Sequence, residues 1–278
     1  MMKRSVTLFV TMMTAASLLA HDGVHDQIAT VTARIKEQPK NAALYLQRGE
    51  LHRLHESWAE ARRDFDRAAK LDPALELVDF ARGRMELEAG RTALAKKSLD
   101  KYIALHPEHA EARLIRARAL VKLKRTAEAI GDYDAAVKHM AKPSPDLYHE
   151  RAKVLAGMGP ENVLVALRGL DEGMQVLGVL ASLQQQAIEL EVGAGRIDEA
   201  LARLDTLAAQ SQRKELYLTE RGEILMKAGR TAEAQAAFRE ALDRIAALPA
   251  PQQSSRMTRQ LVERLNAALA TEPPPHTH

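Results

Sequence analysis

Cysteine is absent from the 278-residue sequence, so the chain can form no disulfide, has no thiolate nucleophile and offers no cysteine for lipid attachment. Aromatic residues make up only 4% of the chain while alanine is abundant, which favours closely packed helices over a sheet sandwich. There is also no glycine-rich phosphate loop and no nucleophile elbow. We therefore predict a protein that is not an enzyme and that has no cofactor.

The first twenty residues have the composition of an export signal. Lys3 and Arg4 supply a positive start, and the apolar run Val6–Ala20 is too short to span a membrane comfortably. We predict a signal peptide over residues 1–20 with cleavage after Ala20, although Leu18 is larger than the residue usually found at that position. The protein would then be exported, as a periplasmic or secreted protein. The alternative is an uncleaved membrane anchor.

Net charge gives no reason to expect a nucleic-acid partner. The whole chain has 40 basic and 37 acidic residues, and removal of Lys3 and Arg4 leaves 38 against 37, or +1. The few aromatic residues sit mostly at helical core positions. We therefore expect neither nucleic-acid binding nor, after signal cleavage, membrane association.

Histidines are concentrated at the start of the mature chain. His21 and His25 lie in the segment HDGVHD, and a freed His21 would offer both its amine and its imidazole to copper or zinc. The alternative is a frayed polar terminus whose aspartates favour the start of the next helix.

The sequence repeats with a period of 34 residues. Pro39, Pro73 and Pro107 are spaced 73 − 39 = 34 and 107 − 73 = 34. Within the first unit, small residues lie where two helices would touch, and larger apolar residues recur between them at helical spacing. Asp72 and Pro73 then stop the second helix, because proline lacks an N–H and disfavours helix in the preceding residue.

This pattern resembles the tetratricopeptide repeat family, over nearly all of the exported chain. Three positions in each of six units carry the resemblance: a small residue midway in the first helix, an alanine opening the second, and a bulky residue four further on. They are Gly49, Gly83, Ala117, Ala152, Ala187 and Gly222; Ala61, Ala95, Ala129, Ala166, Ala200 and Ala234; and Phe65, Leu99, Tyr133, Leu170, Leu204 and Phe238. The resemblance implies an all-α fold, a right-handed superhelical solenoid of about six helix-turn-helix repeats.

Segments outside the repeats predict caps at both ends of the stack. Residues 21–41 contain a short amphipathic helix with Ile28, Val31 and Ile35 on one face, and residues 250–270 predict a helix with Met257, Leu261, Leu265 and Leu269 on one face. The repeats are expected at about 42–75, 76–109, 110–143, 145–178, 180–213 and 215–248, and the proline-rich residues 271–278 as a disordered tail. Extra glycines around Gly157 and Gly173 make the fourth repeat the expected place for a bend or local softness.

Arginine recurs just before the small residue of each first helix except in the fifth repeat, which has Gln186. Asp64 and Asp132 share one position in the second helices of repeats one and three. We therefore predict two ion pairs that join the helices of a repeat, Arg48–Asp64 and Arg116–Asp132.

A second ladder, two residues later, bears on function. In the proteins that this chain resembles, this position faces the concave groove, and here it carries Arg84, Arg118 and Lys153 in the middle repeats. The predicted basic strip is flanked by Phe80, Leu114 and Lys122. It suits an acidic or C-terminal segment of a protein partner, because charged hydrogen bonds favour carboxylates. The alternative is an ordinary solvated face.

From these features we predict a non-catalytic protein-interaction scaffold of the cell envelope that holds a peptide or protein segment in its groove. One alternative is a periplasmic copper- or zinc-handling protein that uses His21 and His25. A further alternative is a non-catalytic subunit of an envelope enzyme complex.

Overall fold

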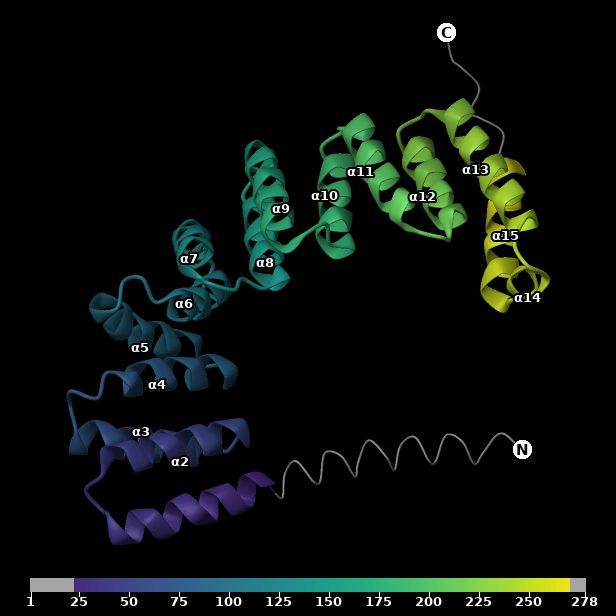
Figure 1. The fold of residues 1–278 in the computed structure, drawn as a ribbon. Coiled ribbons are helices and arrows are strands. Elements are labelled where there is room, and N and C mark those ends of the chain that lie inside the picture. Colours follow the sequence, from purple (N-terminus) through teal and green to yellow (C-terminus); the bar gives the residue numbers. More distant parts are fainter. Residues whose placement is uncertain (1–22, 271–278) are drawn as a thin grey trace, which may run out of the picture. The chain divides into compact units, whose positions relative to one another are not determined.

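The computed structural model describes residues 23–270, and within that range the regular structure is entirely helical. The predicted signal peptide, His21 and the predicted C-terminal tail lie outside the described residues. The labelled helices follow one another along the chain (Figure 1). The chain divides into two compact units, the first ending at Pro143 and the second starting at Ser144. The division falls at the Pro143-Ser144-Pro145 stretch, where prolines interrupt the helical pattern.

Unit 1 contains three helical hairpins after a first helix over residues 23–37. The hairpins are α2 (Ala42–Leu54) with α3 (Trp58–Leu71), α4 (Leu77–Glu88) with α5 (Thr92–Leu105), and α6 (Ala110–Lys122) with α7 (Thr126–His139). They are repeats one, two and three.

Unit 2 contains three more hairpins and two helices after them. Repeat four is α8 (Pro145–Ala156), a 3₁₀ turn at Pro160–Asn162 and α9 (Val163–Leu177); repeat five is α10 (Ala181–Gly193) with α11 (Ile197–Gln210); and repeat six is α12 (Lys214–Lys227) with α13 (Thr231–Ala246). They are followed by α14 (Ala250–Gln253) and α15 (Arg256–Ala270). None of the helices within residues 23–270 combines the length and apolar character needed to cross a lipid bilayer.

The described part of the chain has one helix before repeat one and two helices after repeat six. Val31 and Ile35 are buried in a cluster with Leu44 and Leu51 of α2, so the first helix covers the apolar face of repeat one. At the other end the single helix expected over residues 250–270 is wrong, because the chain breaks at Ser254 and Ser255 between α14 and α15. Leu261 and Leu265 are buried as expected, but Met257 is 65% exposed.

The small residues of the first helices make room for large side chains of the second helices. A Cβ atom added at Gly49 would lie 2.5 Å from the Phe65 ring, and one added at Gly222 would also overlap the Phe238 ring. Phe65 is fully buried and Phe238 is 2% exposed. The repeat pattern in the sequence thus records the close approach of the two helices of each hairpin.

Repeat four keeps its second helix intact despite its glycines. α9 runs unbroken from Val163 to Leu177. A Cβ added at Gly173 would lie 2.7 Å from the Tyr148 ring of α8, and Tyr148 is buried. Gly173 therefore admits a bulky ring, a role that the sequence pattern did not predict, and the extra turn residues form the 3₁₀ segment that precedes α9.

Both predicted ion pairs within repeats are present. The Arg48 guanidinium donates to both carboxylate oxygens of Asp64 at 2.8 and 2.7 Å, and this bonding raises the pKa of Arg48. Arg116 makes the same two bonds to Asp132, at 2.7 and 2.8 Å. Asp64 and Asp132 are buried, and each is held by a geometry suited to a carboxylate.

The first-helix arginines also bond to an aspartate in the repeat before. Arg82 donates to Asp66 at 2.8 Å, and Arg116 donates to Asp100 at 2.9 Å. In unit 2, Arg221 donates to Asp205 at 2.8 Å. All three aspartates lie at the same register position of their second helices, so these bonds join successive repeats.

Repeat five reaches the same connection from the opposite helix. Gln186 replaces the arginine of the first helix, but Arg203 stands in the second helix where repeats one and three have Asp64 and Asp132. Arg203 donates to both oxygens of Asp171 in the preceding repeat, at 2.6 and 3.0 Å, and to Glu191 at 2.9 Å. In repeat five the arginine that bonds to the preceding repeat therefore lies on the second helix, whereas in repeats two, three and six it lies on the first.

Candidate binding surface

In unit 1 the predicted basic strip is interleaved with carboxylates. Arg84 of α4 donates to Glu50 of α2 at 2.6 Å and lies 3.5 Å from Glu111 of α6. Glu50 also accepts from Arg53 at 2.9 Å, and Arg53 continues to Glu88 at 2.8 Å. The charge of Arg84 is therefore compensated by neighbouring first helices, and it contributes less positive field than the sequence ladder suggested.

The remaining predicted residues of unit 1 lie in different environments. The Arg84 guanidinium lies over the Phe80 ring, 5.4 Å from its centroid, and Phe80 is half-buried against Tyr102 and His109. Leu114 is buried, with 7% of its surface exposed, and so belongs to the core. Arg118 is half-buried, whereas Lys122 is exposed at the end of α6.

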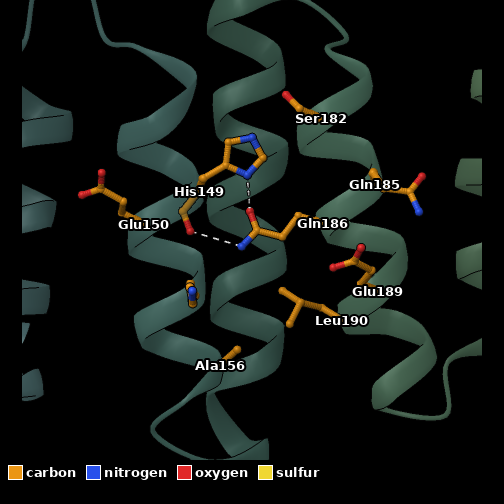
Figure 2. Close-up of a pocket in the computed structure, with 9 residues that line it drawn as sticks. His149, Glu150, Ala156, Ser182, Gln185, Gln186, Glu189 and Leu190 are labelled. Carbon is orange, nitrogen blue, oxygen red and sulfur yellow. Dashed lines mark hydrogen bonds between the residues drawn. The ribbon is translucent and has the colours of Figure 1, made fainter.

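Lys153 belongs to unit 2, where it lines a pocket of about 620 Å³ between α8 and α10 (Figure 2). From α8 the wall includes His149, Glu150 and Lys153, and from α10 it includes Ser182, Gln185, Gln186 and Glu189. These side chains belong to the first helices of repeats four and five. Two carboxylates, one ammonium group and two amides therefore surround one concavity.

His149 and Gln186 hold each other across the floor of this pocket. The Gln186 side-chain nitrogen donates to the main-chain oxygen of His149 at 3.1 Å, which leaves the Gln186 amide oxygen 2.5 Å from His149 Nδ1 (Figure 2). Because that amide oxygen can only accept, Nδ1 carries the proton. With Nδ1 protonated, Nε2 faces away from Gln186 and is an acceptor in the tautomer that carries a single proton.

The pocket thus presents fixed polar groups of both kinds. Gln185 is oriented as well, since its side-chain nitrogen donates to Glu220 of α12 at 2.7 Å. The oriented amide and imidazole groups match the donors and acceptors of an extended main chain, and Lys153 can pair with a carboxylate.

Histidines of the first helix and of repeat one form a separate group in unit 1. The His25 ring lies against the His55 ring with centroids 4.5 Å apart, and His55 Nδ1 is 3.1 Å from the Ser57 hydroxyl. Burial lowers the pKa of His52, which lies 3.9 Å from Asp64. Within residues 23–270 there is no group of three or more histidine or acidic side chains arranged to hold a metal ion. Metal binding by His21 and His25 stays a prediction, because His21 lies outside the described residues.

Two features of unit 2 escaped the sequence analysis, although a signal for both was present. Gln186 was the single exception in the arginine ladder, and it is the residue that orients His149. A residue that breaks a repeating pattern indicates a local difference in structure. Here Gln186 coincides with the pocket wall and with the position of Arg203 on the second helix of the same repeat.

Comparison with known families supports the repeat assignment. The sequence profile of the tetratricopeptide repeat matches residues 80–146 and 186–249. The first match lies in unit 1 except for its last three residues, and the second lies in unit 2. A search of curated protein sequences finds no significant match.

Solved structures with the same fold have low sequence identity. A tetratricopeptide repeat protein from Parabacteroides merdae is 17% identical with a TM-score of 0.53, over 91% of this chain and 96% of that one. MamA from Desulfovibrio magneticus is 15% identical with a TM-score of 0.51, over 63% and 97%. YrrB, described as a TPR protein with an unusual peptide-binding site, is 16% identical with a TM-score of 0.50, over 73% and 97%. At these identities the likeness concerns the fold alone: this chain has an all-α fold of helical hairpins like that of tetratricopeptide repeat proteins, and the profile matches two parts of it.

Proposed function

We propose that the chain is a non-catalytic interaction scaffold that binds an extended segment of a partner protein on its first helices, in the pocket between α8 and α10. The observation that carries the proposal is the set of oriented polar side chains around that pocket. His149, Gln185 and Gln186 are held by hydrogen bonds, yet none of them belongs to the apolar core. Fixed donors and acceptors lower the entropy that a ligand must lose on binding.

The chemistry of the wall indicates the form of the bound segment. Main-chain amides of the segment would bond to the amides and imidazole, and a carboxylate would bond to Lys153. Glu150 and Glu189 stand in the same wall, so a segment of mixed charge fits better than a uniformly acidic one. A peptide-binding site named for YrrB supports the general role, although the two chains share only the fold.

We further propose that the protein works outside the cytoplasm, in the cell envelope. The proposal depends on the charged and apolar composition of residues 1–20. N-terminal sequencing of protein recovered from the periplasm or medium is expected to begin at His21. A product that retains Lys3 and Arg4 in a membrane fraction would support the uncleaved anchor instead.

Binding is tested by filling the pocket. Ser182 is exposed on α10 at the pocket wall, and Ser182→Arg places a long side chain there without removing a core group. A photo-crosslinking residue introduced at Lys153 should capture a partner from envelope extracts, and Ser182→Arg should abolish that crosslink. Ala209→Arg on α11, exposed and outside the pocket wall, is the matched control. Equal crosslinking in both variants would refute the assignment of the pocket.

A further inference from the structure

A second concavity lies in unit 1, between α3, α4 and α5, and has a volume of about 290 Å³. Its wall carries four cationic side chains, Arg62, Arg82, Lys97 and Lys101, and two carboxylates, Asp66 and Glu86. Arg82 and Arg84 are two residues apart on α4, so they project to different sides of that helix. The concavity is therefore distinct from the surface that carries Arg84.

The concavity arises from one break in the repeat register. In repeats one and three this position of the second helix carries Asp64 and Asp132, which receive the first-helix arginine of the same repeat. In repeat two the position is Ser98, which is shorter and uncharged and which lines the concavity. Arg82 instead donates to Asp66 at 2.8 Å and lies 3.5 Å from Asp79. Repeat two therefore has an opening where the sister repeats have a carboxylate.

The charge of this opening is positive. Its lining sums to four cations minus two carboxylates, or +2. Outside the lining, Asp79 lies 4.0 Å from Lys101 and Arg91 contacts Glu86, and these two charges cancel. Glu86 is held by Arg62 at 2.7 Å, and Lys101 is 59% exposed. Lys97 is exposed as well. The two lysine ammonium groups can therefore turn toward an incoming anion, since each is a mobile point charge on a flexible stem.

Repeat six has an opening at the same register with the opposite charge. Ala237 takes the place of Ser98, Arg221 donates to Asp205 just as Arg82 donates to Asp66, and a concavity of about 550 Å³ results. Its lining includes three carboxylates, Asp205, Glu233 and Glu240, against one arginine, or −2. Loss of the carboxylate at this register thus opens the surface in both repeats, whereas the positive charge is particular to repeat two.

We propose that the opening between α3, α4 and α5 binds an acidic side chain of a partner protein, whose carboxylate takes the place that Asp64 and Asp132 occupy in the sister repeats. Arg82, Lys97 and Lys101 would donate to it, and the Ser98 side chain leaves the space for it. This site shares no residue with the α8–α10 pocket, so the two proposals can be tested and refuted independently.

The test restores the missing carboxylate within the chain. Ser98→Asp should pair with Arg82, close the opening and weaken the binding of a fluorescein-labelled hexaglutamate peptide, measured by fluorescence anisotropy at low salt, by about tenfold or more. Ala237→Asp is the matched control, because it adds the same side chain to the acidic opening of repeat six and should leave the affinity unchanged. A second variant, Lys97→Gln with Lys101→Gln, changes only exposed side chains and should also weaken binding.

Each other outcome overturns the proposal. The peptide could fail to bind the unaltered protein, or could bind Ser98→Asp or the double lysine variant as tightly as it binds the unaltered protein. Loss of binding on Arg118→Glu with none on Ser98→Asp would assign the acidic ligand to the first-helix face instead. Competition at matched ionic strength identifies the chemistry: glutarate should displace the peptide, and displacement by inorganic phosphate alone would refute the choice of a carboxylate.

Discussion

Replacing Gly49 with alanine should destabilise unit 1, although alanine is the better helix former. The added Cβ would lie 2.5 and 2.7 Å from two carbon atoms of the Phe65 ring, where carbon atoms pack best at about 3.5–4.0 Å. The ring must therefore move by about 1 Å. Phe65 is fully buried against Ala61, Ala68 and their neighbours, so such a movement disturbs the whole cluster. Overpacking of this kind costs about 1–3 kcal/mol.

The helix propensity of alanine opposes this cost. Glycine in a helix interior is about 1 kcal/mol less favourable than alanine, so the net loss of unfolding free energy should be about 1 kcal/mol and at most about 2. Gly131 provides the matched control. It lies inside α7, is exposed, and an added Cβ would meet nothing within 4 Å. Gly131→Ala should therefore stabilise the protein by about 0.5–1 kcal/mol, with the opposite sign.

Urea unfolding followed by circular dichroism gives the free energies, and amide hydrogen exchange in α2 and α3 locates the effect. A repeat protein need not unfold in one step, so exchange is the more direct measurement. Gly49→Ala with Phe65→Leu should cost less than the two single changes added together, since the smaller side chain accepts the new Cβ. If Gly49→Ala stabilised the chain as much as Gly131→Ala, the close approach of α2 and α3 would be refuted.

Three further predictions concern individual side chains. Lys124 adopts φ 62° in the turn after α6, where repeat two carries Gly90 at φ 76°, so Lys124→Gly should raise the urea midpoint slightly and Gly90→Ala should cost about 1 kcal/mol. Burial lowers the pKa of His52 below its ordinary value of 6.5. The contribution of the neutral His52 to the free energy of unfolding is therefore full above pH 6.5 and is lost as the pH falls through the lowered pKa. His52→Gln should flatten the fall in urea midpoint between pH 7.5 and 5. Arg203→Met removes the cation from Glu191, whose side chain is 4% exposed, and thermal unfolding should show a loss of about 2–4 kcal/mol, with Arg203→Lys retaining part of it.

The parts of the fold that repeat could be predicted from the sequence. A recurring spacing of 34 residues located the small residues and the alanines of the first three hairpins, with Pro73 and Pro107 after the first two, and the same residue pattern at slightly longer spacings located the other three. The pairs Arg48–Asp64 and Arg116–Asp132 could also be predicted, because both partners face each other within one hairpin. In each case the residues involved lie close in sequence or share one register.

Features that depend on one exceptional position could not be predicted in the same way. Gln186 indicated only that an arginine was missing; the compensating Arg203 lies on the other helix, and its bond to Asp171 depends on how successive repeats pack. The compensation of charge on the first-helix face likewise depends on contacts between repeats. Glu50 and Arg84 occupy the same register in neighbouring repeats, so they are close enough to neutralise one another.

The aspartate register explains why this scaffold carries different surfaces on similar hairpins. The link between successive repeats is made in repeats two, three, five and six, always to an aspartate five residues after the alanine that opens the second helix. That link leaves the position two residues earlier free to vary. Where it carries Asp64 or Asp132, the hairpin is closed by an internal ion pair. Where it carries Ser98 or Ala237, an opening forms whose charge is set by neighbours that the link does not constrain. The link between repeats and the surface openings therefore depend on separate positions of one helix, so a substitution at the second position can open a concavity while the link between repeats is kept.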